Sequence, residues 1–494
     1  MKYKLIIVLG ILMTSSWSCQ DFLNEEPVSQ INAETFYTDA SSAEIGLTGI
    51  YNRFFNEYCY SMIITPILTS TDDIKQPSGA FYAFKQRGSE LNATLAPLRQ
   101  WGTLYETIAN VNFMLDEVSK LNSEEFKPNQ GRRDEILAEG HFIRAVSYYY
   151  LTVAWGDVPL ITEFPQSIED ALVAKSPKEE VVAQIKEDLE IAAKDLPDMI
   201  GSYSTDQVTN QVKGRASKWA AKAYLARLAL QENDWQTALN LSEEIINSGL
   251  YPFTTQWRKI FQEPMNSSES IFEQQNDYSP GFFGSGQYGW FFGFDFEWSE
   301  TALNIFEKPD SIGVTQGKDV RFDLAYNPHP WAAQAQPNKY IPPRRFEDGG
   351  IEQTNFAIIR LSELLLNKAE CLNEINFASN KEEVISILNM LRARAEDATW
   401  VNGWYANVPV GTTGIPPLDP NDFTTQEDLR QAIREEKRRE FVFEDVIRWV
   451  DLFRWDKEYL KEITESPTDD HLYFPIPTDE IIRNPKLTQN PAYN

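Results

Sequence analysis

Apolar residues recur at helical spacing in several long segments of the chain, and these segments come in pairs. Phe142, Val146, Tyr149 and Val153 lie three or four positions apart, and the pattern ends at the sequence GDVP over 156–159. Further periodic segments are 213–230 with 235–248, and 359–375 with 381–394. Because this spacing places side chains on one face of a helix, the segments predict amphipathic helices. Their pairing predicts helical hairpins and a mainly α fold.

The pair 213–230 and 235–248 partly matches a tetratricopeptide repeat. The matching positions are Leu225, Ala226 and Ala238, where that repeat has a leucine, a small residue and an alanine. Ala229 and Ser242 stand where the repeat usually has large residues. The partial match predicts divergent helical hairpins and not a regular array.

Three stretches, 60–100, 255–350 and 398–426, interrupt the helical pattern. They carry Pro, Gly and aromatic residues without a sustained period, so they predict long ordered loops or short strands. Loops on a rigid scaffold are where binding groups are most often found. We therefore expect a scaffold of helical hairpins that supports a loop-rich ligand-binding face.

The N-terminus has the features of a secretory signal. Two lysines precede an apolar stretch over 5–13, and the small residues Ser16 and Ser18 lie just before Cys19. The apolar stretch is about half of the ~20 residues that span a bilayer, so it does not predict a transmembrane helix. Ordinary signal cleavage and lipoprotein processing would both cut before Cys19, and the second would attach a lipid to its thiol. We expect removal of 1–18, lipidation of Cys19 and a mature domain over 19–494 that is anchored to a membrane surface.

The charge of the chain limits its partners. The formal net charge is −28, and loss of the two lysines within 1–18 would make it about −30. Such a surface repels phosphate, so we expect neither nucleic-acid binding nor binding to anionic lipid. Cys59 and Cys371 are the cysteines that follow Cys19. They allow at most one disulfide, and the sequence does not show whether they meet.

Sequence motifs give no support for catalysis or for a resident cofactor. The chain has no HExxH, GxSxG or P-loop motif, and its three histidines lack a second ligand at metal-binding spacing. Residues 284–289 fit the dinucleotide fingerprint, but neither a buried strand precedes them nor a helix-forming run follows. We expect no catalytic residues, no metal and no cofactor. Carboxylates are so numerous that the sequence neither supports nor excludes a glycosidase.

Aromatic residues are densest between 278 and 298, where ten rings alternate with glycines. One interpretation is a loop that packs its own rings beneath the surface. The other is a binding surface, because the apolar face of a ring stacks on flat, partly apolar ligands such as sugars. We expect one or two of these rings to face a ligand.

The chain also carries short motifs in a fixed order. They are CQDFL at 19–23, GDVPL at 156–160, RLSE at 360–363, EEKRREF at 435–441, DL at 451–452, RW at 454–455, YFPIP at 473–477 and QNPAY at 489–493, together with Pro27, Tyr105, Ile108, Glu444 and Arg448. Segments 101–112 and 138–149 extend the match. From end to end, this combination resembles the SusD/RagB family of outer-membrane nutrient-binding lipoproteins.

The resemblance implies a mainly helical fold with tetratricopeptide-like hairpins that support a loop-rich face. It also implies a non-enzymatic, lipid-anchored protein that faces the cell exterior at the outer membrane. Such a protein binds oligosaccharides and passes them to a SusC-like TonB-dependent transporter, for which it is the lid. Alternatives are a surface glycoside hydrolase, a family member that binds another nutrient such as peptides, and a purely structural helical scaffold.

Candidate ligand-binding residues come from the irregular stretches. They are Asp72, Tyr82, Phe84, Arg87, Tyr288, Trp290 and Trp331, with the rings for stacking and with Asp72 and Arg87 for hydrogen bonds. Trp101 begins a predicted helix and is expected in the core.

The charged residues between Arg438 and Arg454 are interpreted as structural. Val442, Val446, Val450 and Phe453 would give one helix an apolar stripe. The charges on that helix are therefore expected to pair across the fold.

Overall fold

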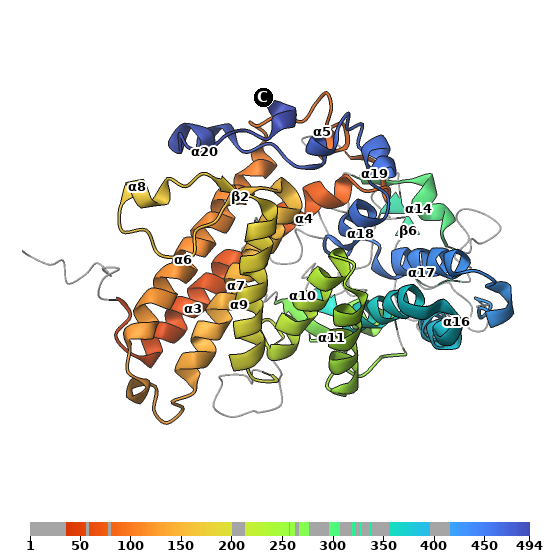
Figure 1. The fold of residues 1–494 in the computed structure, drawn as a ribbon, viewed down its shortest axis with the longest axis horizontal. Coiled ribbons are helices and arrows are strands. Elements are labelled where there is room, and N and C mark those ends of the chain that lie inside the picture. The colour runs from red at the N-terminus through yellow and green to blue at the C-terminus, as the bar shows by residue number, and fades with distance from the viewer. Residues whose placement is uncertain are drawn as a thin grey trace, which may run out of the picture.

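The computed structural model describes residues 36–55, 59–77, 81–199, 213–255, 257–261, 266–275, 296–306, 319, 321, 327–328, 335–336, 355–395 and 415–494. Helices dominate this part of the chain, which confirms the predicted mainly α fold, and they lie side by side in Figure 1. The longest are α3 (Ala40–Phe55), α6 (Gln100–Lys120), α7 (Arg132–Trp155), α9 (Lys178–Asp195), α10 (Lys218–Gln231), α11 (Trp235–Asn247), α16 (Leu361–Ala395) and α17 (Gln426–Phe441).

Helix α7 is the centre of the N-terminal helices and packs against α3, α6 and α9. Every residue from Phe142 to Trp155 is buried, because apolar, aromatic and small side chains occupy most of this segment and Arg144 donates to the buried carboxylate of Asp188. The helix ends at Trp155, directly before Gly156, as predicted. The φ of Gly156, 73°, lies in the region that favours glycine, and a Cβ atom there would lie 3.1 Å from the ring of Tyr473.

The two later hairpins also follow the predicted pairing. Helix α10 begins at Lys218, five residues after the predicted start, because the Ser217 side chain accepts from the backbone N–H of Ala220 and caps the helix there. Asn233, at φ 59°, turns the chain into α11. Helix α16 consists of two helices that meet at a kink at Asn376, between the predicted segments 359–375 and 381–394.

The remaining elements are short. They are α5 (Tyr82–Lys85), α8 (Ile168–Ala171), α12 (Arg258–Phe261), α14 (Glu300–Asn304), α18 (Ile447–Trp455), α19 (Lys457–Ile463), α20 (Thr478–Arg483), β1 (Ile74–Pro77), β2 (Val158–Pro159), β3 (Lys175–Ser176), β4 (Ser270–Gln274), β5 (Phe296–Trp298), β6 (Asn327–Pro328), β7 (Ala335–Gln336) and β8 (Phe356–Arg360). Among the described residues the strands form four antiparallel pairs, β1–β5, β2–β3, β4–β8 and β6–β7.

Helix α4 (Cys59–Thr69) lies where the sequence predicted irregular chain. Its described aliphatic side chains, including Ile63, Ile64 and Ile67, are buried, and the helix contains Pro66. Because this segment is apolar without a polar face, it lacks the periodicity that reveals a surface helix. The prediction of irregular structure over 60–69 was therefore wrong.

The predicted single helix through the charged C-terminal motif was also wrong. Helix α17 ends at Phe441, and a turn with Phe443 at φ 59° and Asp445 at φ 44° leads into α18. Asp445 is held in this turn from two sides, since its carboxylate accepts from Arg227 at 2.8 Å and from the hydroxyl of Tyr150 at 2.9 Å. Tertiary contacts therefore set the break.

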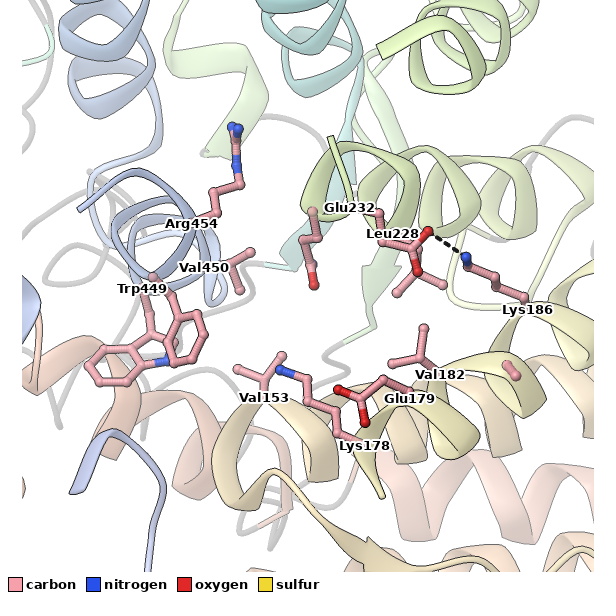
Figure 2. Close-up of a pocket in the computed structure, with 13 residues that line it drawn as sticks. Val153, Lys178, Glu179, Val182, Lys186, Leu228, Glu232, Trp449, Val450 and Arg454 are labelled. Carbon is pink, nitrogen blue, oxygen red and sulfur yellow. Dashed lines mark hydrogen bonds and ion pairs between the residues drawn. The ribbon is translucent and has the colours of Figure 1, made fainter. Parts of the chain in front are cut away.

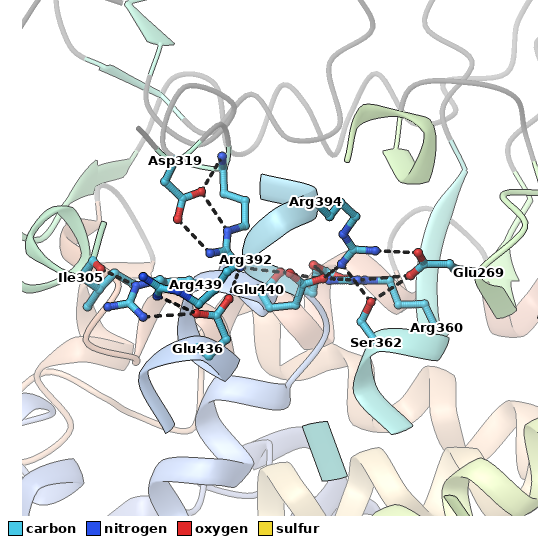
Figure 3. Close-up of polar contacts among 12 residues, drawn as sticks. Glu269, Ile305, Asp319, Arg360, Ser362, Arg392, Arg394, Glu436, Arg439 and Glu440 are labelled. Carbon is cyan, nitrogen blue, oxygen red and sulfur yellow. Dashed lines mark hydrogen bonds and ion pairs between the residues drawn. The ribbon is translucent and has the colours of Figure 1, made fainter. Parts of the chain in front are cut away.

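The expected pairing of charges across the fold is confirmed by a buried network (Figure 3). Glu440 accepts from Arg360 at 2.6 Å, from Arg321 at 3.2 Å and from Arg394. Burial by itself would raise the pKa of Glu440, but the charges of Arg394, Arg360 and Arg321 outweigh it and lower that pKa to about 2. The network joins β8, α16 and α17 to residues 319 and 321.

Two other expectations concern the core. Trp101 is buried, as predicted. Cys371 is a buried free thiol, so it forms no disulfide with Cys59, and burial raises its pKa to about 12. Within the described ranges, no helix combines the length and the apolar character that crossing a bilayer requires.

Candidate functional site

Strand pair β1–β5 brings together two segments that the sequence analysis proposed separately for ligand binding. Ile74 pairs with Trp298 and Pro77 with Phe296, so residues 74–77 lie beside residues 296–298, the end of the aromatic run 278–298. The backbone N–H of Ser299 donates to the carbonyl of Asp73 at 3.0 Å, just beyond the strands. The two segments, more than 200 residues apart in the chain, therefore lie side by side, and we call the region of β1, β5 and the adjoining α5 the loop face.

Asp72 lies beneath the loop face and is held by arginines. Arg448 donates to both of its carboxylate oxygens, and the hydroxyl of Tyr459 donates to Oδ2 at 3.2 Å. Arg438 lies 3.2 Å from the same oxygen. Burial alone would raise the pKa of Asp72, but Arg448 and Arg438 lower it to about 2. The carboxylate is ionised and already paired, so in this structure it positions the loop.

Phe84 and Arg87 are also buried, and both contact the C-terminal segment. The ring of Phe84 has no exposed surface and lies edge-on to Phe474, with 4.9 Å between ring centroids. Arg87 donates to the carbonyls of Phe84 and Leu472 and to Ser70, and it lies over the ring of Trp449. Neither side chain reaches the surface, so their proposed ligand contacts find no support in this arrangement.

Tyr82 and Lys85, on the short helix α5, are only partly buried. The ammonium of Lys85 donates to the carbonyl of Thr71 at 2.5 Å, and burial lowers its pKa to about 8. Lys85 was not singled out from the sequence, because no motif marks it. The stacking role of Tyr82 stays a prediction, and Lys85 lies on the same short helix.

The other sequence-based candidates lie outside the described residues. They are Cys19, Tyr288, Trp290, Trp331 and the glycine-rich segment 284–289. Their roles stay predictions. Among the residues that are described, no three His, Cys, Asp or Glu side chains are grouped to hold a metal ion.

A pocket of about 340 Å³ lies elsewhere on the molecule, between α9, α10 and α18 (Figure 2). Val182, Leu228 and Val450 form apolar walls, and Lys178 and Glu179 rise from the first turn of α9. Lys186 and Glu232 form an ion pair of 2.5 Å at its edge. Sequence reasoning missed this pocket, because its lining comes from α7, α9, α10 and α18, and α18 lies more than 200 residues after the others in the chain.

Comparisons with known proteins agree with this fold. The sequence matches the SusD family over residues 334–493, and a SusD-like family described as starch-binding and associating with the outer membrane over 21–230. A SusD-like protein of Formosa agariphila is 26% identical over 100% of this chain and 99% of its own length.

Solved structures give the same result. A SusD superfamily protein from Bacteroides vulgatus superposes with a TM-score of 0.71 at 22% identity, covering 93% of this chain and 100% of the other. A laminarin-binding SusD-like protein superposes with a TM-score of 0.68 at 20% identity, covering 92% of this chain and 100% of the other.

Proposed function

This chain belongs to the SusD/RagB family, and on that premise we propose that it binds oligosaccharide nutrients at the cell surface and delivers them to a SusC-like TonB-dependent transporter. In this proposal Cys19 carries the lipid that anchors the protein in the outer membrane, with the acidic body facing outward. The protein is then the lid of the transporter and performs no chemistry on its ligand.

The observation that carries the proposal is the β1–β5 pairing. The paired strand β1 also contacts α5, the helix that carries Tyr82 and Lys85. Aromatic faces stack on sugar rings, while lysine and backbone groups donate hydrogen bonds to hydroxyls. We propose that Tyr82, Tyr288, Trp290 and Trp331 supply the stacking surface. The matched family described as starch-binding and the laminarin-binding relative support a glycan as the ligand.

Shallow stacking with few hydrogen bonds gives modest affinity, which suits release to a partner. The test is affinity electrophoresis of the mature protein in gels that contain starch, laminarin or other polysaccharides. We expect at least one polysaccharide to retard the wild type, and Trp290→Ala to lose most of that retardation. Trp235→Ala, which changes a partly buried ring on α11, is the matched control. A panel that retards neither wild type nor variants would contradict the proposal.

The same panel separates the alternatives. A surface glycosidase would release reducing sugar from a polysaccharide and lose that activity on replacement of two specific carboxylates. A binder of peptides would respond to a peptide library and not to glycans. Binding of glycan without turnover is the result that the proposed function requires.

A further inference from the structure

The pocket between α9, α10 and α18 shares no lining residue with the loop face. Val153, Val182, Leu228 and Val450 form its aliphatic walls and are directed toward a common space (Figure 2), and charged, amide and aromatic side chains line the rest. A volume of about 340 Å³ is large enough for a six-membered ring with a substituent. Binding at apolar walls of this kind gains free energy when an apolar group replaces water there.

Two of the three basic side chains that line the pocket are neutralised by the protein itself. Lys186 pairs with Glu232 at 2.5 Å. Arg454 donates to Glu370 at 2.5 Å and to Asp451 at 3.0 Å. Both cations are therefore already paired with carboxylates of the protein and are not available to a ligand.

Lys178 differs from both. Within the described part of the chain, no carboxylate lies within ion-pair distance of its ammonium, and its hydrogen-bond acceptor is the hydroxyl of Tyr473 at 3.4 Å. Its Nζ lies 5.2 Å from the ring centroid of Phe453, and the Nζ of Lys457 lies 4.8 Å from the same centroid. Two ammonium groups over one ring repel each other, and a cation–π contact replaces an ion pair only in part.

A chamber of about 20 Å³ adjoins the pocket and shares Gln231, Val450 and Arg454 as lining residues. Asn367 also lines this chamber, and its buried amide nitrogen donates to no group that the structure describes. The site therefore offers a cation that forms no ion pair among the described residues, aliphatic walls and a neighbouring polar chamber.

We propose that this pocket binds a small organic carboxylate with an apolar body, with the carboxylate at Lys178 and the apolar body against Val182, Leu228 and Val450. An anion beside Lys178 relieves the repulsion between the two lysines and gives Lys178 the charged partner that it lacks. The proposal is independent of glycan binding at the loop face, and either can fail without the other.

The test compares two fluorinated probes of nearly equal shape, para-fluorophenylacetate and its neutral amide, by fluorine NMR line broadening on the mature protein. We expect the acid to bind about tenfold more tightly than the amide, because a charge-assisted contact contributes on the order of 1.4 kcal/mol or more. In Lys178→Met, which nearly keeps the length of the side chain, the affinity of the protein for the acid should fall to its affinity for the amide.

A second variant tests the position of the apolar body. Ala183 is exposed and lines the pocket, so Ala183→Phe can fill the space without entering the core. This variant should lose both probes while it keeps its retardation by polysaccharide. Lys194→Met is the control, because Lys194 lies on the same helix with 80% of its side chain exposed.

Equal binding of acid and amide to the wild type would overturn the proposal. So would acid binding that survives both Lys178→Met and Ala183→Phe, or no detectable binding of the acid. The probe comparison on the wild type decides the question even where a variant fails to fold.

Discussion

Arg448 donates two hydrogen bonds to Asp72, from Nε to Oδ1 at 2.8 Å and from Nη2 to Oδ2 at 2.7 Å, although 376 residues separate them in the chain. This bidentate pair fixes the segment between α4 and β1 against α18. Because β1 in turn pairs with β5, the ion pair sets the position of the whole loop face.

Breaking this pair from one side should destabilise the protein. Arg448→Met leaves a buried carboxylate without its main partner, so we expect the free energy of unfolding to fall by about 3 kcal/mol. Urea unfolding followed by far-ultraviolet circular dichroism measures this change. The double variant Asp72→Leu/Arg448→Met should recover part of the loss. Strictly additive effects of the two single variants would contradict a direct coupling between them.

Stability should decrease in acid. The folded-state pKa values of Glu440, Asp72 and Glu370 are each lowered to about 2, because neighbouring arginines outweigh burial. Carboxylates with lowered folded-state pKa values stabilise the protein above their unfolded pKa values, and that contribution is lost as the pH falls through the folded values. The free energy of unfolding should therefore decrease from about pH 5 toward about pH 2. Glu440→Gln should make the free energy of unfolding less dependent on pH. A wild type whose free energy of unfolding is constant between about pH 5 and about pH 2 would contradict this prediction.

The helical hairpins were predictable because their signals are local. Helix α7 ends where Gly156 permits positive φ, and the periodic segments that flank Asn376 became the two halves of α16. The loop-face candidates were less predictable. Asp72 resembles a ligand-binding acid in the sequence, but a partner 376 residues away neutralises it. Ion pairs between residues so far apart in the chain form only when distant helices pack together. The same holds for the pocket beside Lys178.

Replacing Tyr82 should weaken glycan binding, whereas replacing Phe84 should lower stability. Tyr82→Ala removes a partly exposed ring, so we expect weaker glycan binding, by about tenfold, with an unchanged unfolding free energy. Phe84→Ala removes a fully buried ring and should cost about 3–5 kcal/mol of stability. Thermal unfolding and calorimetric titration of the same samples measure both quantities. A Tyr82→Ala variant that binds as the wild type does would remove Tyr82 from the site.

Lipid attachment should depend on one cysteine. Cells grown with a palmitate analogue should label the wild type, and Cys19→Ala should abolish the label because the acceptor thiol is gone. Cys371→Ala is the control, since that thiol is buried. Labelling of Cys19→Ala equal to that of the wild type would refute the proposed anchor.

The transporter partnership predicts a stable complex. Purification of the native protein from detergent-solubilised outer membrane should also recover a large barrel protein of the TonB-dependent class. Recovery of the protein alone under mild conditions would contradict its role as a lid.

Glycan capture itself is measured by calorimetric titration of the wild type and of the double variant Tyr288→Ala/Trp290→Ala. The ligand is an oligosaccharide of the polysaccharide that retards the wild type in gels. We expect saturable binding to the wild type and a loss of affinity of about tenfold or more in the variant, because in the proposed site stacked rings supply most of the contact. Equal affinity in both proteins, or no heat of binding in either, would contradict glycan capture at the loop face.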